Sequence, residues 1–186
     1  PLGKVDNSND SLAHARTVMG IKGDYLSYGL QCKTTEKFIP EDYLFNTREA
    51  RLELLRGLMD TDGCCSKQGE VFYSTSSYAL ATDFVKLVRS LGGIVGGICE
   101  EDGSDFVIKG RQCTRKTNYR ITFNLPEEKI FHLERKQKRV AQKNRTYTYI
   151  SGIQYIGESE ATCISVDADN HLFICENFIV SHNTAS

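Results

Sequence analysis

The chain has 186 residues, a formal net charge of −1 and 40% hydrophobic residues, which suits one large or two small soluble globular domains. No apolar run approaches the roughly 20 residues of a membrane-spanning helix, and no charged-then-apolar leader is present, so we expect a cytoplasmic protein without a membrane partner. The seven cysteines form no Cys-x-x-Cys pair, which argues against a zinc ribbon and a secreted disulfide framework.

The first strong signals in chain order predict a helix. Asn46 followed by Glu49 fits a capping box. Apolar residues then recur at helical spacing as far as Asp60, and Gly63 ends the pattern. The apolar positions of this predicted helix are Ala50, Leu54, Leu55, Leu58 and Met59.

The elements that follow alternate between strand and helix patterns. They are a strand over 71–75, a helix from Ser76 or Ser77 to Gly92, strands over 94–99 and 119–123, and a short helix from Pro126 to about Glu134. The order helix, hairpin, helix, hairpin, helix predicts an α+β unit with an antiparallel sheet.

The composition changes after this unit. Residues 134–145 hold six basic side chains and one acid, Glu134, and we place a domain boundary there. Such a stretch fits DNA contact and a solvent-facing helical linker equally well. Beyond it, apolar residues fall in short β-rich runs, which predict an all-β tail of about 40 residues, too short to be a comfortable domain alone.

One motif in the predicted unit carries chemistry. Residues 55–63 read Leu-Arg-Gly-Leu-Met-Asp-Thr-Asp-Gly, and this run resembles the signature of the LAGLIDADG homing endonucleases. The resemblance covers roughly residues 37–134 and implies that Asp62 binds Mg²⁺ while Asp60 is structural or a capping residue. Arg56 stands where the family often has a small residue, which loosens helix packing there. The alternative interpretation is a simple helix-ending turn.

The resemblance also implies that the endonuclease is incomplete in this chain. Such enzymes have two motifs in one chain, or one motif and a homodimer, whereas a single motif occurs here. We therefore expect residues 4–36 to be the tail of an upstream repeat. Double-stranded DNA is the implied partner, because strands in the major groove read base edges and basic side chains contact phosphates.

Five basic residues around the second hairpin are candidates for DNA contact: Lys109, Arg111, Arg115, Lys116 and Arg120. Four acids nearby oppose that role: Glu100, Glu101, Asp102 and Asp105. A solvated hairpin is the alternative interpretation.

A second constellation lies at the C-terminal end. Cys163 is followed by His171 and then by an apolar run that leads into Ser181-His182-Asn183-Thr184. This pattern resembles the C-terminal end of an intein, which completes the all-β Hint fold. The resemblance implies that Asn183 cyclises and cleaves its own peptide bond, with His182 polarising the carbonyl or donating a proton and His171 assisting the amide.

The same resemblance implies that Thr184 is the first extein residue and accepts the acyl group in transesterification, with no cofactor. Cys163 stands where many inteins carry an aspartate. Three roles stay open for it: a proton carrier, a thiol nucleophile, or a buried strand residue.

The N-terminal half of a Hint domain, with its initiating nucleophile, does not occur in the chain, so an N-terminal intein fragment is the implied partner. The chain is then a fragment or the C-terminal member of a split intein. The expected organisation is 1–3 tag remnant, 4–36 upstream repeat, 37–134 endonuclease repeat, 135–145 basic linker, 146–183 Hint part and 184–186 extein. The alternatives are an endonuclease or DNA-binding module that does not splice, and a purely structural α+β domain.

Overall fold

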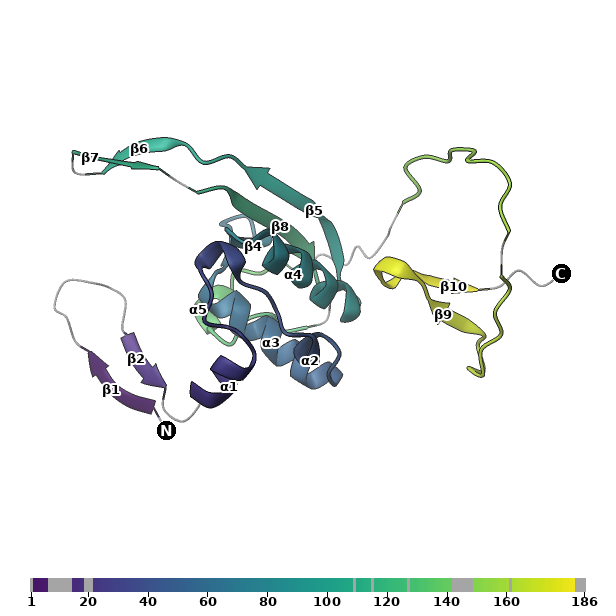
Figure 1. The fold of residues 1–186 in the computed structure, drawn as a ribbon, viewed down its shortest axis with the longest axis horizontal. Coiled ribbons are helices and arrows are strands. Elements are labelled where there is room, and N and C mark those ends of the chain that lie inside the picture. The colour runs from purple at the N-terminus through teal and green to yellow at the C-terminus, as the bar shows by residue number, and fades with distance from the viewer. Residues whose placement is uncertain are drawn as a thin grey trace.

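The protein is built around a four-stranded antiparallel sheet (Figure 1). The computed structural model describes residues 2–6, 15–18, 22–108, 110–114, 116–126, 128–141, 149–160 and 162–182. The strand order is β3-β4-β8-β5, with β3 at Gly63–Cys65, β4 at Val71–Thr75, β8 at Asn118–Asn124 and β5 at Ile94–Glu101. This sheet confirms the predicted mixed α+β class with antiparallel pairing.

Two helices, α3 (Arg48–Thr61) and α4 (Tyr78–Ser90), pack against the sheet. The structure corrects the predicted cap of α3: the N-cap is Thr47, whose side chain accepts a hydrogen bond from the Ala50 amide, rather than Asn46. Asn46 instead accepts from the Thr47 amide. Ser77 caps α4 as the sequence predicts, by accepting from the Leu80 amide at 3.2 Å.

The core lies between the helices and the inner face of the sheet. Tyr73 and Phe84 are fully buried and stack with ring centroids 4.2 Å apart. The Tyr73 hydroxyl has no hydrogen-bond partner among the described residues, and burial, followed by the charge of Asp62, raises the pKa of Tyr73. A Cβ at Gly63 would lie 2.6 Å from the Met59 backbone, so only glycine fits between α3 and β3.

The predicted helix from Pro126 to Glu134 is wrong for residues 128–133, because α5 spans Glu134–Gln137 instead. Before α5, side chains accept the hydrogen bonds of backbone amides that a helix would otherwise pair internally. The Gln137 side-chain oxygen accepts hydrogen bonds from the amides of Ile130 and Phe131, each at 3.0 Å. After α5, the Ala141 amide donates to the Gly69 carbonyl, and a Cβ at Gly69 would lie 2.4 Å from that of Ala141.

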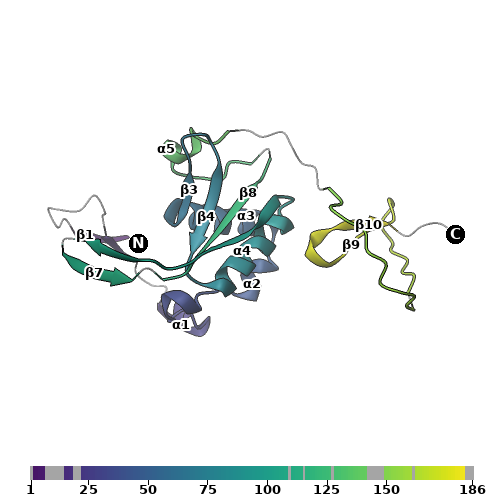
Figure 2. The same ribbon diagram turned by 90° about the horizontal axis from the view of Figure 1, so that it is seen from above.

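Two further hairpins lie outside the central sheet (Figures 1 and 2). One pairs β1 (Leu2–Asp6) with β2 (Ala15–Val18), so part of the expected tag remnant lies in a strand. The other pairs β6 (Asp105–Ile108) with β7 (Arg111–Thr114) and extends outward from β5 and β8. The short helices between the first hairpin and α3 are α1 (Lys22–Ser27), η1 (Thr34–Glu36) and α2 (Glu41–Leu44).

The C-terminal tail contains one small hairpin, in which β9 (Leu172–Ile174) and β10 (Val180–His182) flank η2 (Glu176–Phe178). The predicted β-rich runs before it are not found, since 149–160 and 162–171 contain no strand. Ile153 is 91% exposed, and the other residues from 149 to 160 are exposed as well. No helix in the described part of the chain is long and apolar enough to cross a membrane.

Candidate functional site

The C-terminal end of α3 presents Asp62 to solvent. Asp62 is the C-cap residue, and its amide donates to the carbonyls of Leu58 and Met59. It lines a groove of about 520 Å³ together with Lys37 and Lys116. The hydroxyl residues Thr34, Ser74, Thr75, Ser76 and Thr117 also line this groove. The end of the predicted motif helix is therefore a polar groove with one carboxylate and two ammonium groups.

Lys136 of α5 closes the end of the same helix. Its ammonium group donates three hydrogen bonds, to the carbonyl oxygens of Met59 (3.0 Å), Asp60 (2.9 Å) and Gly63 (2.7 Å). The last carbonyls of a helix lack partners within the helix and carry partial negative charge, so a cation is favoured there. Burial, followed by the neighbouring Arg135, lowers the pKa of Lys136, whereas the charges of Asp60 and Asp62 oppose that decrease.

Sequence reasoning missed this lysine, because a basic stretch looks like a solvated linker when its partners are unknown. The residues before it also contact α3. The Leu133 amide donates to the Asp60 carboxylate at 3.2 Å, and Arg48 pairs with Glu128 at 2.7 Å. The segment 128–137 therefore runs along α3 rather than leading away from it.

Arg56 belongs to the same set of contacts. Its Nε donates to the Lys129 carbonyl at 2.7 Å, and its Nη1 donates to the Glu53 carboxylate. This hydrogen bond, followed by the one from His132, lowers the pKa of Glu53. Arg56 thus connects α3 to the segment 128–137. Gly57, the next residue, is exposed, with open space where a Cβ would stand.

The five residues predicted to contact DNA have different surroundings in the structure. Lys109 and Arg115 lie outside the described residues, as does the side chain of Arg111, whose backbone is in β7. Lys116 lies in the groove with Asp62. Arg120 lies on β8 with its guanidinium 3.9 Å from the centre of the Phe72 ring, and it pairs with Glu70 at 3.1 Å. Its charge is therefore partly neutralised within the chain.

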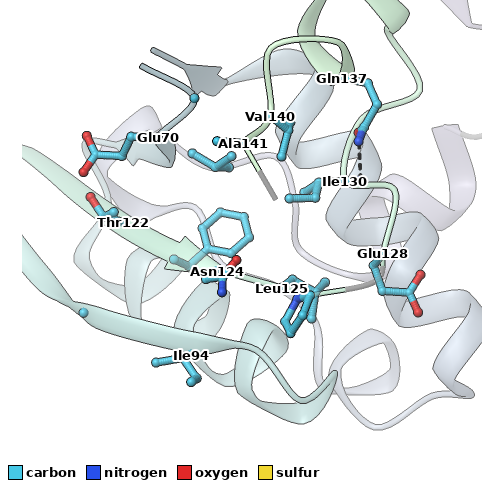
Figure 3. Close-up of a pocket in the computed structure, with 15 residues that line it drawn as sticks. Glu70, Ile94, Thr122, Asn124, Leu125, Glu128, Ile130, Gln137, Val140 and Ala141 are labelled. Atoms are coloured by element: carbon cyan, nitrogen blue, oxygen red, sulfur yellow. Dashed lines mark hydrogen bonds between the residues drawn. The ribbon is translucent and has the colours of Figure 1, made fainter. Parts of the chain in front are cut away.

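A second pocket, of about 460 Å³, lies between the sheet and the segment after β8, residues 125–141 (Figure 3). Val140 and Ala141 line one side and Asn124 and Leu125 the other, while the Gln137 side chain bonds to the Ile130 backbone at its rim. None of the residues predicted to carry chemistry lines this pocket. It is a gap left by the packing of the segment after β8, distinct from the Asp62 groove.

The tail brings two predicted site residues together. In the β9–β10 hairpin, His182 pairs with Leu172, which places it beside His171. The two imidazole rings lie edge to face with centroids 6.5 Å apart. His171 adopts a left-handed φ of 54° at the end of a turn in which its amide donates to the Ala168 carbonyl.

The remaining tail candidates are only partly described. Asn183 and Thr184 lie outside the described residues. Cys163 is exposed and lies in a stretch without regular structure in the chain alone. No group of three or more His, Cys, Asp or Glu side chains in the described ranges is arranged to hold a metal ion.

Comparison with known proteins gives two matches. Residues 49–119 match the family of the LAGLIDADG-like domain, from the first turn of α3 to the start of β8. This match supports a homing endonuclease domain, a DNA-binding type of module, within the α+β unit. The replicative DNA helicase DnaB of Mycobacterium intracellulare is 33% identical over 155 residues, which cover 80% of this chain and 26% of the helicase. The chain thus spans about a quarter of that relative's length.

Proposed function

We propose that the chain is the C-terminal part of an intein, which splices together with an N-terminal intein fragment and carries half of a homing endonuclease. The observation that carries the proposal is the proximity of His171 and His182, with ring centroids 6.5 Å apart, on a hairpin that ends just before Asn183. Two neighbouring imidazoles on a hairpin that leads into Asn183 along the sequence suit the cleavage of the peptide bond after that residue.

In the proposed reaction, the Thr184 hydroxyl takes the acyl group from the partner's thioester or ester, and Asn183 then cyclises. The Asn183 amide nitrogen attacks its own carbonyl carbon, the bond to the Thr184 nitrogen breaks, and a succinimide forms. His182 polarises that carbonyl or supplies the proton for the departing amine, while His171 assists the attacking amide. Cys163 acts as a proton carrier, as a thiol nucleophile, or as a strand residue that is buried once the β-fold is completed.

The match to a replicative helicase supports the proposal independently. Its aligned stretch of 155 residues is longer than the 71 residues from 49 to 119 that match the endonuclease-like family, so the similarity extends beyond that domain. An endonuclease-like domain within a sequence that resembles a helicase is expected of an inserted element. We therefore propose a replicative helicase as the host, with Thr184-Ala185-Ser186 as its first residues after the intein.

For the endonuclease half, we propose Asp62 as a Mg²⁺ ligand in the groove beside Lys37 and Lys116. Mg²⁺ prefers carboxylate and phosphate oxygens and keeps several waters, so one carboxylate fits one half of a paired site. When bound, the ion would stabilise charge on the scissile phosphate. Lys116, which lines the same groove, would contact a phosphate there, and Lys136 holds the helix end that carries Asp62.

The isolated chain is expected not to cut both strands of DNA efficiently, because Asp62 supplies a single carboxylate. The measurement is a nicking and cleavage assay in Mg²⁺ over varied sequences, with Asp62→Asn as the matched variant. Robust double-strand cleavage that disappears in Asp62→Asn would mean that the chain forms homodimers, and the half-site proposal would be wrong.

Splicing is tested by mixing the chain with an N-terminal intein fragment that carries a foreign extein and measuring intact masses. The expected product is that extein joined to Thr184-Ala185-Ser186, with a mass loss from the chain. Hydrogen exchange of the tail reports binding separately, and we expect it to slow as the β-fold is completed. If neither ligation nor binding occurs, the non-splicing endonuclease module, which the Asp62 groove favours, becomes the better interpretation.

A further inference from the structure

The tip of the β9–β10 hairpin contacts the helices of the α+β unit. Arg89, in the last turn of α4, donates a hydrogen bond from Nη1 to the Asn177 side-chain oxygen at 2.6 Å. Residues of η2, among them Phe178, line a groove of about 460 Å³ together with residues of α4, of α2 and of its flanks, where Phe38 and Phe45 lie. The contact therefore joins two segments that are 88 residues apart in the chain.

The conformation of the tip requires support. Asn177 and Phe178 both have left-handed φ values, 60° and 61°, which are unfavourable for residues other than glycine, above all for a bulky aromatic. The Cys175 amide donates to the Ile179 carbonyl at 2.8 Å and closes the turn. Such strain persists only where the surroundings hold the backbone in place.

The hairpin itself is too small to supply that support. Each strand has three residues, and an isolated two-stranded hairpin is marginally stable at best in water. Ile174 and Val180 pair across the two strands and are 66% and 60% exposed, so they bury little apolar surface. The free energy that keeps the hairpin formed must come from elsewhere, and the groove on α2 and α4 is the described surface that touches its tip.

We propose that this groove is a docking site for residues 176–178 of the same chain, and that docking holds the β9–β10 hairpin formed before any other chain binds. Arg89 makes the contact through its hydrogen bond to Asn177. Lys86, one turn earlier on α4, pairs instead with Asp83 at 3.5 Å. Glu176 adds an acidic group to the same groove. The inference concerns the free chain and holds whether or not the chain splices.

The test is amide hydrogen exchange of the full chain with no partner, comparing Arg89→Ala with Lys67→Ala. Arg89→Ala should speed exchange of Cys175 and of the β9–β10 amides by roughly tenfold, because the docked tip opens more often. Lys67→Ala removes a positive charge from an exposed residue that does not line the groove, and it should change these rates less than about twofold. The core amides of α4 should be equally protected in both variants.

Asn177→Gly provides the second arm, because it removes the amide acceptor while tolerating the left-handed backbone. It should speed exchange as Arg89→Ala does, and the double variant should be no faster than either single one. Equal rates in wild type, Arg89→Ala and Asn177→Gly would overturn the proposal. So would protection that falls on dilution, since the occupant of the groove would then be a second copy of the chain.

Discussion

Asn183→Ala is expected to abolish release of Thr184-Ala185-Ser186, with a loss of roughly 1,000-fold or more in rate. No other side chain can form the five-membered ring at that bond, and alanine has no amide nitrogen to attack the carbonyl. The fold should be unchanged, because Asn183 lies beyond the last strand, β10. Intact mass spectrometry after incubation with the N-terminal fragment measures the release directly.

Ser165→Ala is the matched control, because it removes an exposed polar side chain from the same tail without touching either histidine. Release should proceed at the wild-type rate in this variant. His171→Ala and His182→Ala should each be slower than wild type but not silent, since both act on the asparagine rather than replace it. Loss of the tripeptide from Asn183→Ala at the wild-type rate would show that cleavage is hydrolytic and not cyclisation.

Lys136→Met should lower the free energy of unfolding by about 2 kcal/mol, since hydrogen bonds to charged groups contribute roughly 1.5–3 kcal/mol and partial exposure reduces the sum. Methionine keeps the apolar stem but removes the ammonium donor from the carbonyl oxygens of Met59, Asp60 and Gly63, of which Met59 keeps its bond from the Asp62 amide. Urea unfolding followed by far-ultraviolet circular dichroism gives the difference, because the chain has no tryptophan to report on folding.

Lys138→Met removes the same charge two residues later and is the control. Its side chain is 78% exposed and faces Glu134 at 3.7 Å, a surface pair one helical turn apart. Such pairs contribute about 0.3–0.5 kcal/mol, so the stability should hardly change. Equal losses in the two variants would mean that the ammonium group of Lys136 is solvated and that the end of α3 is held by other contacts.

The sequence predicted elements whose signals are local. The helices α3 and α4 follow from apolar spacing and from hydroxyl caps, and β4 follows from a β-branched and aromatic run that the structure places at Val71–Thr75. The same holds for the end of α3, where the motif predicts a carboxylate at the helix terminus and Asp62 is found as the C-cap. Its role as a metal ligand remains a proposal.

What the sequence did not predict depends on contacts between distant residues. Residues 128–133 do not form the expected helix, because their amides donate instead to the side chains of Gln137 and Asp60. No local pattern in the sequence shows these bonds. Lys136 and Asp60 are separated by 76 residues, so their contact is a property of the folded chain. In the tail, apolar periodicity predicted strands, but a strand needs a neighbour, and only the β9–β10 pair has one among the described residues.

The bond between Ala141 and Gly69 fixes the point from which the tail departs. Between this anchor and Asn177 the chain has roughly 35 residues, so the hairpin tip behaves as a ligand tethered to its own receptor. Tethers of this kind give effective concentrations in the millimolar range. At an effective concentration of about 1 mM, a contact with a dissociation constant of about 0.1 mM would be closed about nine-tenths of the time, which agrees with the roughly tenfold faster exchange expected of Arg89→Ala. A single proteolytic cut between 149 and 160 would therefore let the hairpin dissociate, although it changes no residue of the groove.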